Sequence, residues 1–179
     1  MKSRTFRRTF AFFAEKQISE VFKVALLLLA LAVPAAAQKP TIQLIPFTSA
    51  FVPAADACGF DVLATPQAGR PNKERMIQFA NMVILAGPLF VTLKNLSTGK
   101  TIDVNVSGPE HFNVSSNTLV VAGPAIGLAP PPGNLFTAAG LPRLPLTHGQ
   151  IVFTLDDQGN ITSIDKVTGT VQDVCQLLQ

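Results

Sequence analysis

Residues 89–109 read LFVTLKNLSTGKTIDVNVSGP, and this stretch has the clearest β-hairpin pattern in the chain. Apolar side chains alternate with polar ones on both sides of a turn, at Val91, Leu93, Ile102, Val104 and Val106. A period of two places the apolar set on one face of a strand, so the pattern predicts a β-hairpin with one buried face. Gly99 can take the left-handed conformation that closes the turn. Because a lone hairpin cannot bury that face, further strands must cover it.

Other parts of the chain also have strand character. The predicted strands are residues 41–45, 57–64, 74–79, 82–85, 117–121, 149–155 and 161–167. Residues 65–73 are interpreted as a loop, residues 110–111 as a solvated loop, and residues 168–169 as a turn before a final strand or short helix at 170–178. Seven or eight short strands with frequent turns favour a single antiparallel β-sandwich, with a small β-barrel as the alternative.

The first 37 residues are interpreted as a signal peptide, which leaves residues 38–179 as one β-sandwich domain. Residues 24–33 (VALLLLALAV) form an unbroken apolar run, and Ala35-Ala36-Ala37 match the small-residue pattern of a cleavage site. The run is shorter than the roughly 20 residues of a membrane-spanning helix. We therefore expect cleavage after Ala37 and a secreted, extracellular protein with no stable membrane span. An uncleaved amphipathic anchor is the alternative.

The charge of the body differs from that of the whole chain. The chain carries a net charge of +3, but residues 38–179 hold eight basic and nine acidic side chains. A nearly neutral body has no basic patch for a phosphate backbone, so we expect no nucleic-acid partner. The length suits one domain with one core.

Cys58 and Cys175 are the two cysteines of the chain. In an exported protein they most simply form one disulfide, with two buried free thiols as the alternative. Closing a loop of about 100 residues would contribute about 4.7 kcal/mol in the chain-entropy model. Four sequons, which matter only in a host that glycosylates, begin at Asn95, Asn105, Asn113 and Asn160.

The chain has two histidines, His111 and His148, and neither belongs to a Cys/His cluster. The motifs of zinc sites, phosphate-binding glycine loops and nucleophile elbows are missing, so we expect no metal or cofactor. The leading hypothesis is a non-enzymatic binding or surface-associated module whose partner is an extracellular protein or cell-surface ligand. The alternative is a secreted hydrolase whose site is assembled in space from Ser107 or Ser115, His111 and a carboxylate.

Residues 123–147 are rich in proline yet apolar. Prolines lack the ladder donor, so we expect this segment to lie outside the sheets. It is interpreted as a pre-organised recognition loop presenting Phe136, Leu141, Arg143 and Leu144. Two alternatives stay open: these side chains cap an open end of the sandwich, or residues 141–145 form the bait loop of a protease inhibitor.

Four motifs together resemble a family of small secreted bacterial proteins of unknown function. They are ACGFDV around Cys58, VTLKNLSTGKTIDVNVSGP in the centre, LDDQGNITSI, and VQDVC around Cys175. The family has an early cysteine, a central N-L-x-T-G-K hairpin and a late D-x-C in the same order. The resemblance implies a secreted, disulfide-linked β-domain and no particular activity.

Overall fold

A computed structural model describes residues 39–56, 58–127 and 135–179, and the predicted signal peptide lies outside these ranges. The larger of two antiparallel sheets has seven strands in the order β1-β4-β5-β8-β9-β10-β11. These strands are β1 (Thr41–Ile45), β4 (Glu74–Gln78), β5 (Met82–Ala86), β8 (Glu110–Asn113), β9 (Thr118–Ile126), β10 (Pro145–Leu155) and β11 (Ile161–Asp173). The described residues also form two short helices, α2 (Leu135–Ala138) and α3 (Val174–Leu177).

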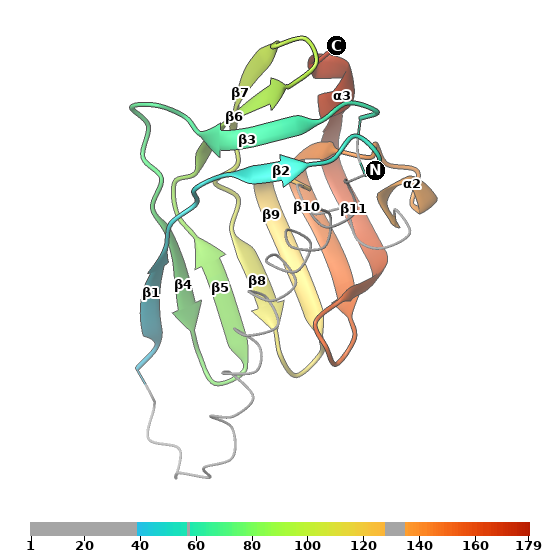
Figure 1. The fold of residues 1–179 in the computed structure, drawn as a ribbon. Helices are drawn as coiled ribbons and strands as arrows, with labels where there is room; N and C mark the ends of the chain where they lie inside the picture. Colours follow the sequence, from blue (N-terminus) through green and yellow to red (C-terminus); the bar gives the residue numbers. More distant parts are fainter. Residues whose placement is uncertain (1–38, 57, 128–134) are drawn as a thin grey trace, which may run out of the picture.

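The smaller sheet has four strands in the order β2-β3-β6-β7. They are β2 (Ala50–Val52), β3 (Val62–Pro66), β6 (Phe90–Asn95) and β7 (Thr101–Asn105). Figure 1 shows this sheet lying across one end of the large sheet, with α3 and the C-terminus beside the β6–β7 hairpin. The predicted all-β sandwich is confirmed. Among the described strands both sheets are open, so the alternative of a barrel is not what forms.

The hairpin predicted at residues 89–109 forms as β6 and β7. Val91 pairs with Val104 and Leu93 with Ile102, and the apolar side chains of both strands face the core. Gly99 closes the turn with φ of 79°, in the left-handed region. The alternation of the sequence was therefore sufficient to predict both the pairing and the buried face.

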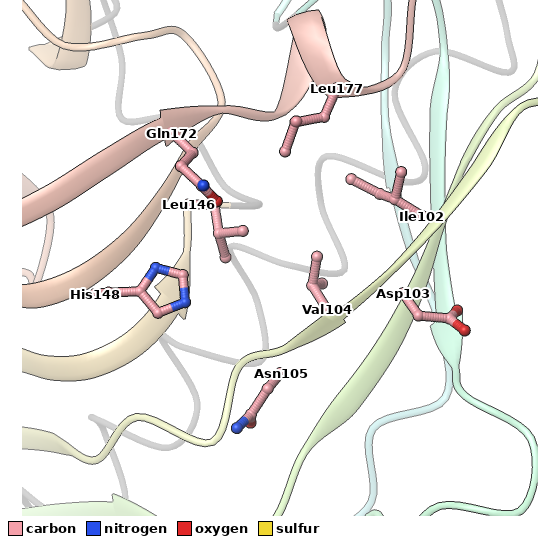
Figure 2. Close-up of a pocket in the computed structure, with 8 residues that line it drawn as sticks. All are labelled: Ile102, Asp103, Val104, Asn105, Leu146, His148, Gln172 and Leu177. Carbon is pink, nitrogen blue, oxygen red and sulfur yellow. The ribbon is translucent and has the colours of Figure 1, made fainter.

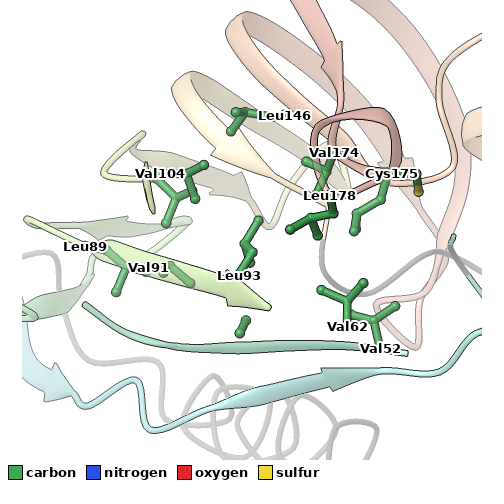
Figure 3. Packing of buried hydrophobic residues seen from close by; sticks show 13 residues of the cluster. Val52, Val62, Leu89, Val91, Leu93, Val104, Leu146, Val174, Cys175 and Leu178 are labelled. Atoms are coloured by element: carbon green, nitrogen blue, oxygen red, sulfur yellow. The ribbon is translucent and has the colours of Figure 1, made fainter. Parts of the chain in front are cut away.

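A first core fills the space between the two sheets (Figure 3). Val62, Val91 and Leu93 enter it from the small sheet, and Leu146 enters it from β10. Residues of the C-terminal segment complete it: Val174, Cys175 and Leu178. These side chains exclude water from the sheet-to-sheet contact, which is the main favourable term that holds the two sheets together.

A second core lies on the opposite face of β10. Side chains alternate along a strand, so Ile151, Phe153 and Leu155 face away from the side that Leu146 occupies. Phe136 of α2 covers them, with its ring 6.3 Å from that of Phe153 in an edge-to-face arrangement. The part of the large sheet around β9 and β10 is therefore covered on one face by the small sheet and on the other by the segment around α2.

One strand prediction had the wrong bounds, and one loop prediction was wrong. The strand predicted at residues 57–64 begins only at Val62 and continues to Pro66, into the predicted loop. Cys58 and Gly59 lie in a turn, where the carboxylate of Asp61 accepts a hydrogen bond from the Ala54 N–H. The polar turn contacts override the apolar alternation of this stretch. Residues 110–111, predicted as a solvated loop, belong to β8 between β5 and β9.

The expectation that residues 123–147 lie outside the sheets was also wrong. β9 continues through Pro124 to Ile126, and β10 already begins at Pro145. The Pro124 carbonyl accepts from the Gly108 N–H at 2.8 Å, on the side away from β10. The N and O of one strand residue point the same way, so the missing N–H of Pro124 is not one that β10 would use. Proline is tolerated here for this reason.

The turn predicted at residues 168–169 is instead part of the continuous strand β11. Gly169 pairs with Gly149 of β10, and a Cβ at Gly149 would lie 2.0 Å from the Thr168 carbonyl oxygen. Glycine marks a close approach of two strands here rather than a turn. The predicted choice between a final strand and a short helix is resolved as both, because β11 ends at Asp173 and α3 follows.

Candidate functional site

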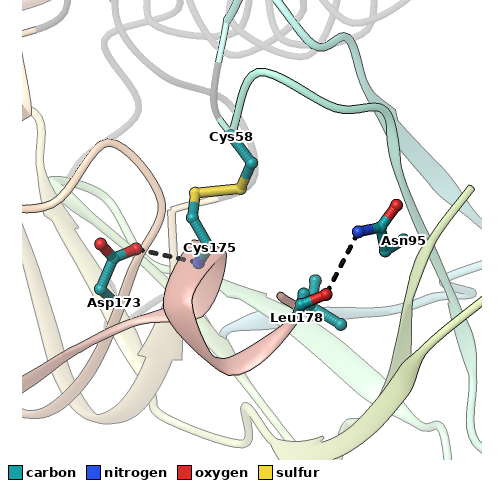
Figure 4. Close-up of a disulfide and its surroundings, with 5 residues drawn as sticks. All are labelled: Cys58, Asn95, Asp173, Cys175 and Leu178. Carbon is teal, nitrogen blue, oxygen red and sulfur yellow. Dashed lines mark hydrogen bonds between the residues drawn. A yellow bond between two sulfur atoms is a disulfide. The ribbon is translucent and has the colours of Figure 1, made fainter. Parts of the chain in front are cut away.

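The disulfide predicted between Cys58 and Cys175 is confirmed, with an S–S distance of 2.04 Å and Cα atoms 5.1 Å apart. Figure 4 shows that it joins the turn before β3 to the helix α3. The carboxylate of Asp173 caps α3 by accepting from the Cys175 N–H at 2.9 Å. The cap and the disulfide together fix α3 against the small sheet.

Asn95 attaches the C-terminus to the hairpin from the other side. Its side-chain amide donates to the Leu178 carbonyl at 3.1 Å, and its oxygen accepts from the Ser97 N–H in the turn (Figure 4). Asn95 is only 2% exposed, so this predicted glycosylation site is inaccessible in the folded protein. The other three sequon residues, Asn105, Asn113 and Asn160, are exposed.

A groove of about 270 Å³ opens between the hairpin and the C-terminal end of the large sheet (Figure 2). Its floor is apolar and consists of Ile102, Val104, Leu146 and Leu177, whose side chains converge in Figure 2. Its rim is polar and consists of Asp103, Asn105, His148 and Gln172. Small-molecule sites usually have volumes of about 300–1,000 Å³, so this groove lies below that range. It suits an aliphatic side chain better than a cofactor.

The open edge of β7 runs along this groove. The Val106 N–H donates to the Leu89 carbonyl, and the Lys100 carbonyl accepts from the Asn95 N–H, so these two residues face β6. By alternation the backbone groups of Thr101, Asp103 and Asn105 point to the other side, where no described strand pairs with β7. An extended chain placed there would find N–H and C=O groups at a regular spacing.

The side chain of Asp103 is already occupied on the outer face of the small sheet. Its carboxylate accepts hydrogen bonds from Thr92 Oγ1 at 2.6 Å and from Gln67 Nε2 at 2.9 Å. Figure 2 shows it pointing away from His148 and Gln172. Asp103 and Asn105, which share a face of β7, therefore contribute their backbone to the groove, whereas His148 and Gln172 contribute polar side chains.

The four residues of the predicted recognition loop are not brought together on one surface. Phe136 and Leu144 are buried, in the second and the first core respectively. Leu141 is half-buried against the second core, and Arg143 is exposed. Residues 128–134 of the loop lie outside the described residues. A recognition role for Arg143 stays a prediction, but two of the proposed apolar contacts are core side chains.

The residues named for a hydrolase site have other partners or positions. The Ser107 hydroxyl accepts from the Leu89 N–H and donates to the Leu89 carbonyl. Ser115 is exposed in the turn after β8, where its N–H donates to the Asn113 side chain. His111 lies within β8, between Ile84 and Val120 of the neighbouring strands. The hydrolase alternative stays a hypothesis that no contact of these residues favours.

Two carboxyl groups on the large sheet have raised pKa values. Burial is the main cause that raises the pKa of Glu110, and the negative charge of Glu74 is the second; together they bring it to about 7. Burial likewise raises the pKa of Glu74. Both lie on the same face, because Leu85 pairs with both Met76 and Glu110 and Glu74 precedes Met76 by two residues. This pair sits in β4 and β8, outside the groove.

The sequence pointed to some groove residues only indirectly. The alternation of the hairpin places Asn105 between Val104 and Val106 on the polar face, and it is exposed there. Gln172 and Leu177 were missed because they flank the boundary between β11 and α3, and the sequence left that region as either strand or helix. Their position becomes predictable only once the disulfide and the Asn95 contact fold α3 towards the hairpin.

Comparison of the chain with protein-family models, with curated proteins and with solved structures found no match. Among residues 39–56, 58–127 and 135–179, no three His, Cys, Asp or Glu side chains are placed to hold a metal ion. No helix in that part of the chain is long and apolar enough to cross a membrane. The resemblance to small secreted bacterial proteins stays a prediction.

Proposed function

We propose that this protein is an exported, non-enzymatic binding module that takes an extended segment of an extracellular protein at β7. One observation carries the proposal: the open edge of β7 lies beside a groove with an apolar floor and a polar rim. A bound strand would pair with the backbone of Thr101, Asp103 and Asn105. Every second side chain would then point towards Val104 and Leu146, which supplies specificity.

Export is the second part of the proposal. The disulfide between Cys58 and Cys175 is compatible with an oxidising compartment, and cytosolic proteins rarely keep such bonds. The apolar run at residues 24–33 and the small residues before Gln38 support a cleaved signal peptide. An exported module would meet partners at the cell surface or in the medium.

A selection from displayed random peptides tests the site. We expect selected peptides to carry aliphatic residues at alternate positions. Thr101→Pro removes one outward N–H at the first residue of β7, where proline is tolerated, and should weaken peptide binding by about tenfold, which is roughly one hydrogen bond. Thr101→Val is the matched control, because it keeps the N–H and should bind as the unchanged protein does.

A second pair of variants tests whether the apolar floor of the groove contributes to peptide binding. Leu177→Gln places a polar amide on the apolar floor and should weaken the same peptides. Leu96→Gln is the control, because Leu96 is similarly exposed in the turn after β6 but does not line the groove. The proposal is wrong if no peptide is enriched, or if the enriched peptides bind all four variants equally.

A further inference from the structure

The strand β1 forms one edge of the large sheet and has an apolar, uncharged sequence, TIQLI. Ile42 is 61% exposed and Leu44 is 63% exposed, the highest values among the large apolar side chains of the described residues. Both lie on one face of the strand. On that face Ile42 is followed across the sheet by Ile77 of β4 and Ile84 of β5, which continue the apolar row.

The backbone of β1 is half unpaired. The Phe79 N–H donates to the Met82 carbonyl, so Phe79, and by alternation Ile77, bonds towards β5. The intervening residues Met76 and Gln78 therefore bond towards β1, where their register partners are Gln43 and Thr41. The N–H and C=O groups of Ile42 and Leu44 consequently point to the open side, where no described strand lies.

The other three edge strands carry features that oppose self-pairing. The strand β2 has only three residues. The strand β11 has two register shifts and the charged side chains of Asp165 and Lys166. The strand β7 has Asp103 at its centre, so a symmetric pair would oppose two carboxylates. Charges, bulges and short length are the usual protections of a sheet edge, and β1 has none of them over its five residues.

We propose that β1 pairs with β1 of a second copy of this chain, antiparallel and about a two-fold axis at Gln43. In this register Ile42 lies opposite Leu44 of the second copy, and Leu44 lies opposite Ile42 of the second copy. These are the residues whose N–H and C=O groups point outwards, so the pair forms four main-chain hydrogen bonds. The same patch serves both copies, as two-fold symmetry requires.

The arrangement also gathers the exposed aliphatic side chains. Ile42 and Leu44 of both copies fall on the same face of the joined sheet and cover one another. Pro40 and Pro46 occupy the next positions of the outward-facing alternation and lack the N–H that would extend the ladder. The contact is therefore short, and its small area places it among weak, concentration-dependent interfaces.

Sedimentation of the protein recovered from cells expressing the full chain tests the pairing. Measured from about 1 µM to about 1 mM, the unchanged protein should pass from monomer to dimer. Leu44→Lys places two cations in the interface and should leave a monomer across this range. Leu96→Lys, at an exposed leucine in the turn after β6 and outside β1, should dimerise as the unchanged protein does. A monomer at every concentration, or a dimer that Leu44→Lys does not weaken, overturns the proposal.

Cysteine cross-linking tests the register. At the two-fold axis the two copies of Gln43 form a non-hydrogen-bonded pair with Cα atoms about 4.5 Å apart, a separation that a disulfide can bridge. Gln43→Cys should therefore give a covalent dimer under mild oxidation. Thr41→Cys is the control, because Thr41 lies opposite Ile45 of the second copy and its own copy is out of reach. Equal cross-linking of the two variants, or none with Gln43→Cys, contradicts this register.

Discussion

Glu110 is the residue whose chemistry departs most from its ordinary behaviour. Its pKa in the folded protein is about 7, above the ordinary value of 4.5, because it is buried on β8 near Glu74. A raised acid pKa means that the folded state holds the proton more tightly than the unfolded chain does. The resulting stability is fully present below pH 4.5 and is lost as the pH rises through 7.

Glu110→Gln should therefore remove a pH dependence of the free energy of unfolding and keep the packing of the side chain. At about pH 8 the variant should be more stable than the unchanged protein by roughly 2–3 kcal/mol, and near pH 5 the two should be similar. Thermal unfolding measured between those two pH values would show it. Asp56→Asn, which removes an exposed carboxylate in the turn after β2, is the control for the loss of one negative charge. A variant destabilised equally at both pH values would show that Glu110 acts through packing.

A comparison of Asn95 with Asn113 distinguishes the stability that comes from turn hydrogen bonds from the stability that comes from a tertiary contact. Both side-chain oxygens accept from backbone N–H groups two and three residues later in a turn. Only Asn95 is buried and also donates to Leu178. Asn95→Ala should lower the free energy of unfolding by about 2–3 kcal/mol, because a buried carbonyl loses its partner, and Asn113→Ala by about 1 kcal/mol or less. Equal losses in denaturant unfolding would mean that the C-terminal contact contributes nothing.

At the scale of elements, the helix α3 is the part whose position depends most on its attachments. It is too short to be stable alone, and the disulfide, the Asp173 cap and the Asn95 contact hold it. The double variant Cys58→Ser/Cys175→Ser should lose about 2–5 kcal/mol and roughly 10 °C in melting temperature. Leu177 loses its fixed position in this variant, so peptide affinity at the groove should fall. The fall should exceed that of the unchanged protein when the unchanged protein is heated until the same fraction of molecules is folded. If the Cys58→Ser/Cys175→Ser variant bound the peptides with unchanged affinity, the disulfide would not be needed to position Leu177.

The elements also show how far the sequence could be interpreted. Strict alternation predicted β6 and β7 because period-two patterns determine both the strand and its buried face. The sequence was misinterpreted at Pro124 and Gly169, where the proline was expected to lie outside the sheets and the glycine to form a turn. The effect of a proline or glycine depends on which side of the strand its neighbours occupy. The groove was not predictable, because it combines β7 with β10, β11 and α3, which only the tertiary fold brings together.

At the scale of the whole molecule, the predicted signal peptide and the disulfide both support the expectation that the protein is exported. If the protein is exported, the recovered form begins at Gln38, so three residues, Gln38, Lys39 and Pro40, precede β1. Mapping the N-terminus of the protein in the culture medium by mass spectrometry checks this. A secreted form that retains residues 24–33 would contradict cleavage after Ala37 and favour an uncleaved anchor.

The central claim is that an extended peptide binds along β7, and amide hydrogen exchange tests it most directly. With a selected peptide bound, the amides of Thr101, Asp103 and Asn105 should exchange more slowly, because their outward N–H groups gain partners. The amides of Ile102 and Val104 already pair with β6 and provide the internal reference. Slowing confined to the three outward amides is the predicted result. A peptide that binds without slowing them would contradict the claim and place the binding site elsewhere.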